Sequence, residues 1–229
     1  RTIFKTSDFM ALLQTSHPFQ VIPTAWIRAA QQRWSPERPE LPGTQRLVPL
    51  SCIALDVAEG GKDRTVKAKR YGDWITLASL PGIQTPKAED SAAFVEPDML
   101  EGGYVLIDAD GVGGQAYGIL REKFKRRARA FRGVKPTLWR DTDWNGQGGT
   151  NEFFNCRAAC WWSARMALDP TNPRKVCLPP GADLLAELAA PRWFMSGQKI
   201  QLEKKADIIT RLGRSCDLAD ACVMALWDG

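Results

Sequence analysis

The chain has 229 residues, of which 44% are hydrophobic, and its formal net charge is +5 at pH 7. This composition is enough for the core of one large domain, and the small positive charge fits a soluble protein with a mild preference for polyanions. No apolar run approaches the ~20 residues that cross a bilayer, which argues against a membrane protein. With one histidine and no Cys-x-x-Cys pair, the sequence also argues against a zinc site.

The first part of the chain, residues 1–45, is rich in proline and is expected to be an extension rather than part of the core domain. Short helices are predicted at 7–15 and 22–30, followed by a linker at 35–43, where three prolines forbid regular structure. No signal peptide is present at the start. Because the chain begins with Arg1 and lacks an initiator Met, we expect a fragment of a longer protein.

The core domain is predicted to occupy 46–229 and to begin with three strands. The apolar run at 48–55 is typical of a strand that is covered on both faces. The segment at 65–70 alternates Val and Ala with Lys, as expected of a half-exposed strand, and another strand follows at 73–80. Because the turns between them are short, we expect an antiparallel meander.

Helices and strands then alternate before the pattern becomes mostly helical from about residue 150. Strands are predicted at 104–108 and 125–131, with a helix before each at 88–96 and 116–123. Later helices are expected at 151–168, 183–190, 204–212 and 217–227. This order predicts an α/β fold in which helices flank a central mixed β-sheet.

Acidic residues end two of these strands and open the last helix. Asp56 follows the run at 48–55, Asp108 closes the second buried strand, and Asp217 and Asp220 lie three residues apart on one helix face. If the two strands are parallel neighbours, both carboxylates emerge at the same sheet edge. Oxygen ligands suit Mg²⁺ or Mn²⁺, and a pair of such ions can hydrolyse a phosphodiester.

Each acidic residue also has a purely structural interpretation. Asp56 and Asp108 could form turns, and Asp217 could serve only as a helix cap. Glu59 and Asp63, in the turn after Asp56, are more typical of a solvated loop. The conjunction of three acidic positions in this order is what favours a metal site.

The densest positive region of the chain lies between residues 121 and 140. Within it, the candidate DNA-contacting residues are Lys123, Lys125, Arg127 and Arg129. On a strand at 125–131 the last three would share one face and could grip phosphates beside the second acidic position. The alternative is a solvated edge strand, whose charges prevent association with another sheet.

The acidic motifs resemble the nuclease domain of the large terminase subunit of tailed bacteriophages. The matching segments are 55–65, 107–113 and 211–221, together with 154–162 between the second and third motifs and 20–23 with 29–30 near the start. The resemblance therefore extends over nearly the whole chain. One departure is Cys216, because relatives often have proline before the acidic residue.

This resemblance implies an RNase H-like fold and an endonuclease that uses two Mg²⁺ or Mn²⁺ ions to cut concatemeric double-stranded viral DNA during genome packaging. The positions that match the family's acidic motifs are Asp56, Asp108 and Asp220. The resemblance implies that these three are the catalytic acids and that Asp56 bridges both ions. Asp217 would be a further metal ligand.

The same resemblance implies partners and a location. An ATPase domain should precede this one in the full-length chain, and ATP would serve only that domain, because no phosphate-binding P-loop motif is present here. The small terminase subunit, the portal and double-stranded DNA would be partners, in the host cytoplasm. Two alternatives stay open: a resolvase- or transposase-type nuclease of the same fold, and a DNA-gripping module of a packaging motor without catalysis.

Overall fold

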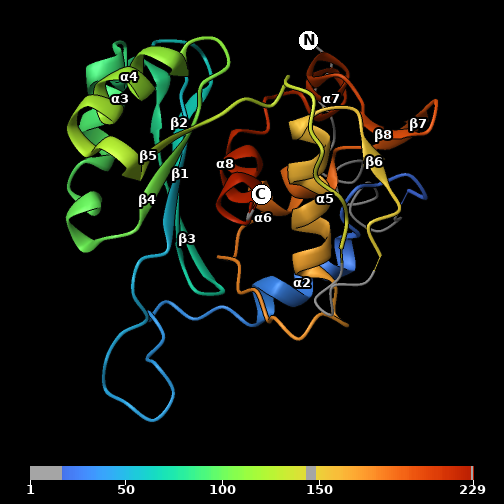
Figure 1. Ribbon diagram of the computed structural model, residues 1–229, viewed down its shortest axis with the longest axis horizontal. Coiled ribbons are helices and arrows are strands. Elements are labelled where there is room, and N and C mark those ends of the chain that lie inside the picture. The colour runs from blue at the N-terminus through green and yellow to red at the C-terminus, as the bar shows by residue number, and fades with distance from the viewer. Residues whose placement is uncertain (1–16, 143–147, 228) are drawn as a thin grey trace.

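The computed structural model describes residues 17–142, 148–227 and 229, so the helix expected at 7–15 lies outside the described residues. A five-stranded sheet with the order β3-β2-β1-β4-β5 forms its centre (Figure 1). The strands are β1 (Cys52–Asp56), β2 (Arg64–Tyr71), β3 (Trp74–Pro81), β4 (Tyr104–Asp108) and β5 (Ala128–Phe131). The first three form the predicted antiparallel meander, and β4 and β5 continue the sheet in parallel with β1.

The central strands are buried on both faces, as their apolar sequences predict. Along β1, Cys52 and Ala54 point into one hydrophobic cluster, while Ile53 and Leu55 point into another. Successive side chains of a strand alternate between faces, so β1 contributes to two separate cores. Asp56 comes next in this alternation and falls on the face of Cys52 and Ala54.

Helices cover both faces of the sheet. The helices are α2 (Thr24–Gln32), α3 (Ala88–Val95), α4 (Gly113–Phe124), α5 (Cys156–Leu168), α6 (Ala182–Ala189), α7 (Lys205–Leu212) and α8 (Asp217–Ala225). Figure 1 shows α3 and α4 on one face and α8 on the other, with α5 beyond α8. The predicted class, a mixed sheet flanked by helices, is confirmed.

Residues 17–45 pack against the rest of the chain. Ile22 and Ile27 are fully buried in the same cluster as residues of α5, α6 and α8. The indole of Trp34 donates a hydrogen bond to the carbonyl oxygen of Ile75, 2.8 Å away. A domain boundary near residue 45 stays a prediction, but this part of the extension contributes to the core that supports α8.

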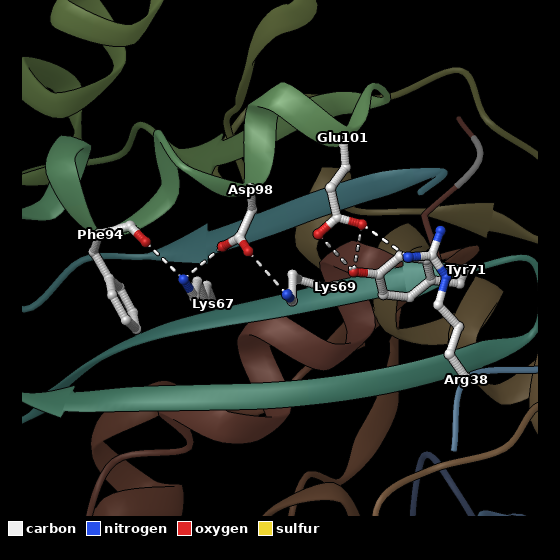
Figure 2. A network of polar contacts seen from close by, with 7 residues as sticks. All are labelled: Arg38, Lys67, Lys69, Tyr71, Phe94, Asp98 and Glu101. Atoms are coloured by element: carbon white, nitrogen blue, oxygen red, sulfur yellow. Dashed lines mark hydrogen bonds and ion pairs between the residues drawn. The ribbon is translucent and has the colours of Figure 1, made fainter. Parts of the chain in front are cut away.

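The lysines of β2 are only partly exposed on a strand whose alternating pattern predicted a half-exposed face. Lys67 and Lys69 both bind Asp98 in the short 3₁₀ helix η2 (Asp98–Glu101), and these side chains are 13–22% exposed (Figure 2). At the end of the same row, Glu101 accepts from Tyr71 and pairs with Arg38. The predicted alternation is present, but the lysine face is less exposed than expected, because η2 covers it and supplies the opposite charge.

Two further expectations need correction. The strand predicted at 125–131 begins only at Ala128, because Lys125 adopts a φ of 52° and the 3₁₀ helix η3 (Lys125–Arg127) follows α4. Consequently Lys125 and Arg127 do not share a strand face with Arg129. The helix predicted from 151 starts at Cys156, where the Asn155 side chain caps it.

The region after residue 150 also contains a small second sheet, which the sequence reading missed. Its strands are β6 (Glu152–Phe153), β7 (Trp193–Ser196) and β8 (Lys199–Leu202), in the order β6-β8-β7. These strands are too short to show an alternating pattern. No helix among the described residues has the length and apolarity needed to cross a membrane.

Candidate active site

Two carboxylates meet at the carboxyl edge of the central sheet. β1 and β4 are adjacent and parallel, with Leu55 opposite Ile107, so Asp56 and Asp108 leave the sheet side by side. In β4, Leu106 belongs to the same cluster as Ala54, and the two aspartates therefore face α8. The sequence prediction required these two strands to be parallel neighbours, and they are.

The chain after Asp108 turns sharply, as its glycines predict. Gly111 has a φ of 72°, and a Cβ atom on Gly113 would overlap the carbonyl oxygen of Asp108. Glycine at these two positions therefore lets α4 begin directly behind the strand end.

The third and fourth carboxylates come from the first turn of α8, which packs on β1 and β2. Asp217 and Asp220 are 9% and 7% exposed, so both are buried against the sheet. Asp217 Oδ2 accepts a hydrogen bond from the backbone N–H of Arg64 at 2.8 Å. Asp220 Oδ1 accepts from the indole Nε1 of Trp161 at 3.2 Å, which sets the orientation of its carboxylate.

A side chain from another helix holds the start of α8. Glu187 of α6 accepts hydrogen bonds from the backbone N–H groups of Leu218 and Ala219 at 2.9 and 3.2 Å, and its other oxygen binds Arg214. The residue at the N-cap position, Cys216, makes no side-chain cap. Glu187 therefore supplies the cap that this helix lacks.

Lys205, the first residue of α7, brings a positive charge into the cluster. Its Nζ lies 2.9 Å from Asp220 Oδ2. The pKa of Lys205 is raised, chiefly by the charge of Asp220 and further by those of Asp56 and Asp108. The ammonium group is therefore an internal counter-ion of the carboxylates.

The carboxylates are close enough to perturb one another. Burial, followed by the charge of Asp220, raises the pKa of Asp56 well above its ordinary value, and Asp108 and Asp217 add to this shift. Burial is also the main cause of the raised pKa of Asp108 and of Asp217. Such mutual repulsion among buried acids is typical of a functional site.

The donor set fits Mg²⁺ or Mn²⁺. Within the described residues, no three Asp, Glu, His or Cys side chains are already closed around a single point. Mg²⁺ does not need such a cage, because it is usually held by one or two carboxylates, with water and substrate phosphate completing the shell. Asp56, Asp108 and Asp220 offer oxygen atoms of this kind, and Lys205 would have to yield Asp220 as an ion binds.

A cavity of about 300 Å³ opens beside these carboxylates. Asp108, Asp220 and Lys205 form part of its wall, while Arg157 and Asn155 contribute from the start of α5. The acidic cluster is therefore reached through a pocket with charge of both signs.

The candidate DNA-contacting residues lie elsewhere. Val105 is opposite Ala128 and Asp108 is opposite Phe131, so the residues just before β5 lie at the amino ends of the strands. That edge is opposite the one that carries Asp56 and Asp108, because α4 runs back along the sheet between Asp108 and β5.

Three of the four candidates also have partners within the chain. Lys123 pairs with Glu96, Arg127 donates to three carbonyl groups of the 99–103 turn, and Arg129 lies 3.9 Å from the centroid of the Tyr104 ring. Lys125 is exposed at the end of α4. A role for these four residues in DNA binding stays a prediction.

Sequence reasoning missed Lys205, Glu187 and Arg157. None of the three belongs to one of the acidic motifs, and each reaches the site from a different helix. The strand-end pattern that located the aspartates carries no information about them.

Comparison with known proteins was informative only for structure: no protein-family model and no curated protein matches the sequence. Similar solved structures include the nuclease domain of the large terminase subunit gp2 of bacterial virus Sf6, with a TM-score of 0.67, 21% identity and coverage of 92% of this chain and 99% of that one. A variant of that domain with manganese and β-thujaplicinol has a TM-score of 0.65 at 22% identity, with 92% and 99% coverage. The large terminase nuclease of thermophilic phage G20c with magnesium has a TM-score of 0.53 at 15% identity, with 82% and 90% coverage.

These likenesses extend over most of the chain and agree with the resemblance of the acidic motifs. The chain therefore has the fold of the nuclease domains of phage large terminase subunits.

Proposed function

We propose that this chain is the nuclease domain of a phage DNA-packaging terminase and cuts concatemeric double-stranded viral DNA with the help of Mg²⁺ or Mn²⁺. The observation that carries the proposal is the meeting of Asp56, Asp108 and Asp220 at one sheet edge, where burial and the charge of Asp220 raise the pKa of Asp56. The fold likeness to terminase nucleases supports the role in packaging.

Divalent ions in this cluster would activate a water molecule and stabilise the oxygen that leaves phosphorus. Asp56 is beside Asp108 on the neighbouring strand and close enough to Asp220 on α8 for that charge to raise its pKa, so it would be the ligand shared by the ions. Trp161 keeps Asp220 in place by its hydrogen bond, and Glu187 holds the first turn of the helix that presents Asp220. Asp217 accepts a hydrogen bond from the backbone of β2 and would serve as an outer ligand.

The reaction itself is hydrolysis of a phosphodiester. The oxygen of water forms a bond to phosphorus, the bond from phosphorus to the leaving ester oxygen breaks, and the proton lost by water balances the one gained by the leaving oxygen. ATP has no part in these steps and would serve the motor domain of a longer chain. The small terminase subunit and the portal are this chain's proposed protein partners, and the host cytoplasm is its proposed location.

The proposal is tested by incubating supercoiled plasmid with the protein and Mn²⁺, Mg²⁺ or EDTA, without ATP. We expect cutting that requires metal and falls at least ~1,000-fold in Asp56→Asn, since a bridging ligand is lost. Asp207→Asn is the matched control, because Asp207 is an exposed aspartate of α7. Equal activity in EDTA, or full activity of Asp56→Asn, would contradict the proposal.

The same assay separates the two alternatives. A resolvase-type enzyme should prefer a four-way junction to linear duplex of the same sequence. A DNA-gripping module should bind duplex and leave it intact under all metal conditions, with Asp56→Asn binding no differently.

A further inference from the structure

One side chain that lines the cavity beside the acidic cluster, Arg157, carries a positive charge that no carboxylate pairs with in the described part of the chain. Arg157 lies in the first turn of α5 and lines the cavity with Asp108 and Asp220. Its Nη1 donates one hydrogen bond, to the carbonyl oxygen of Glu203 at 3.0 Å. Its Nε is buried and has no hydrogen-bond partner among the described residues.

The other positive groups near the cavity are engaged. Lys205 is paired with Asp220, and Arg132 donates to the carbonyl oxygen of Ala109 while lying 3.9 Å from Asp110. Arg157, in contrast, forms no ion pair with a carboxylate in the described part of the chain. A half-buried guanidinium without a negative partner is costly, and a bound anion would relieve that cost.

The start of α5 cannot recognise an anion through its backbone. The N–H groups of Cys156 and Arg157 donate to the carbonyl oxygens of Lys135 and Gly133. The N–H of Ala158 donates to the side chain of Asn155. Anion recognition in this cavity therefore falls to the guanidinium, whose planar donors match the oxygens of a phosphate.

We propose that Arg157 binds a backbone phosphate of the DNA strand next to the phosphate that is cut. This inference rests on the proposed nuclease function. Arg157 lines the same cavity as the Asp108 and Asp220 carboxylates, so a strand that presents one phosphate to the acidic cluster can present a neighbouring phosphate to the guanidinium. Arg157 is in this sense a positioning residue, because it sets where the strand lies and takes no part in proton transfer.

The inference is tested by the salt dependence of duplex binding. Arg157→Gln and Arg157→Lys are made in an Asp56→Asn background, so that binding to a short duplex can be measured with Mg²⁺ without cutting. Arg46→Gln, in the exposed loop between α2 and β1, is the matched control. Loss of one phosphate contact should weaken binding by about tenfold and reduce the slope of log K against log salt by about 0.9 in Arg157→Gln. Arg157→Lys should retain most of the slope, and Arg46→Gln all of it.

A purely structural role of Arg157 would have a different signature. Arg157→Gln would then lower the melting temperature, through loss of the bond to Glu203, while the affinity for duplex and its salt slope stayed unchanged; this result would overturn the inference.

Refutation of the Arg157 phosphate contact can be distinguished from refutation of the proposed nuclease activity. If the protein with Asp56 intact cuts plasmid but Arg157→Gln cuts with unchanged kcat and KM, the nuclease stands and the phosphate contact is refuted. If no variant cuts, the binding measurement still decides whether Arg157 contacts DNA.

Discussion

The ammonium group of Lys205, whose side chain is 48% exposed, lies 2.9 Å from the carboxylate of Asp220, beside the cluster that the proposed metal ions would occupy. Without a metal, this pair offsets the repulsion among Asp56, Asp108 and Asp220. With a metal, two positive charges would compete for the same oxygen atom. Lys205 is therefore expected to stabilise the empty site and to oppose metal binding.

Removing this charge should have two opposite effects. In Lys205→Gln we expect lower stability without metal, because the acids repel one another, and tighter Mn²⁺ binding by roughly tenfold, because no ammonium must be displaced. Isothermal titration with Mn²⁺ measures the affinity, and thermal unfolding in EDTA measures the stability. Lys204→Gln, which changes the exposed neighbour, should alter neither. Unchanged or weaker Mn²⁺ binding by Lys205→Gln would show that the lysine does not compete.

The relation between sequence and structure at this site has a simple physical basis. A strand end is visible locally as an apolar run that stops at a polar residue, so Asp56 and Asp108 could be located from the sequence. The first turn of α8 is visible for the same reason, because the apolar helix begins immediately after Cys216. Parallel pairing of β1 and β4 then brings these local signals together.

Other parts of the structure depend on partners far away in the chain. The cap from Glu187 is separated from Ala219 by 32 positions and has no local pattern. Lys67 and Lys69 follow the alternation of a solvated strand, and only the position of Asp98 reveals that they are covered. The run at 125–131 contains residues compatible with a strand, but the left-handed conformation of Lys125 delays its start.

The two acids of α8 should not be equivalent. Among the acids, the charge of Asp220 raises the pKa of Asp56 most and the charge of Asp217 raises it least. In addition, one carboxylate oxygen of Asp217 already accepts a hydrogen bond from the backbone N–H of Arg64. We expect Asp220→Asn to reduce metal-dependent cutting by at least ~1,000-fold and Asp217→Asn by about tenfold. Single-turnover cleavage of a labelled duplex at saturating Mn²⁺ measures both. The assignment fails if Asp217→Asn is the more damaging change, with both proteins folded by circular dichroism.

Glu187 should make the stability of the protein depend on pH. Burial raises its pKa from the ordinary 4.5 to about 7, so between these values the folded state binds more protons than the unfolded state. The free energy of unfolding therefore falls as pH rises through this window, by at most about 3 kcal/mol from this group.

The contribution of Glu187 can be isolated by substitution. Glu187→Gln removes the titration, so its stability relative to the original protein should improve steadily from pH 4.5 to 7.5. Urea unfolding at several pH values measures the difference in the free energy of unfolding between the two proteins. The aspartates titrate in both proteins, so their contributions cancel in this difference. Glu122→Gln, an exposed position on α4, should follow the original protein at every pH. A constant difference across the window would mean that Glu187 does not titrate there.

Asp98 should be important for stability because it is the shared partner of two lysines. Burial opposes its ionisation, but the hydrogen bonds and charges of Lys67 and Lys69 outweigh this and hold the pKa of Asp98 below its ordinary value. In Asp98→Asn, both ammonium groups would stay beneath η2 without a negative charge (Figure 2). We expect a loss of about 1–3 kcal/mol in the free energy of unfolding at pH 7.

The sign of the pH dependence provides a second check on Asp98. A carboxylate with a lowered pKa stabilises the fold above its ordinary pKa of 3.8, and this contribution is lost as pH falls through its folded-state value. The difference in the free energy of unfolding between Asp98→Asn and the original protein should therefore become smaller at acidic pH. Urea unfolding at pH 7 and at pH 3 measures it, with Glu89→Gln on the exposed side of α3 as the control. If Asp98→Asn is as stable as that control at pH 7, Lys67 and Lys69 do not depend on Asp98, and packing alone holds this face of β2 against η2.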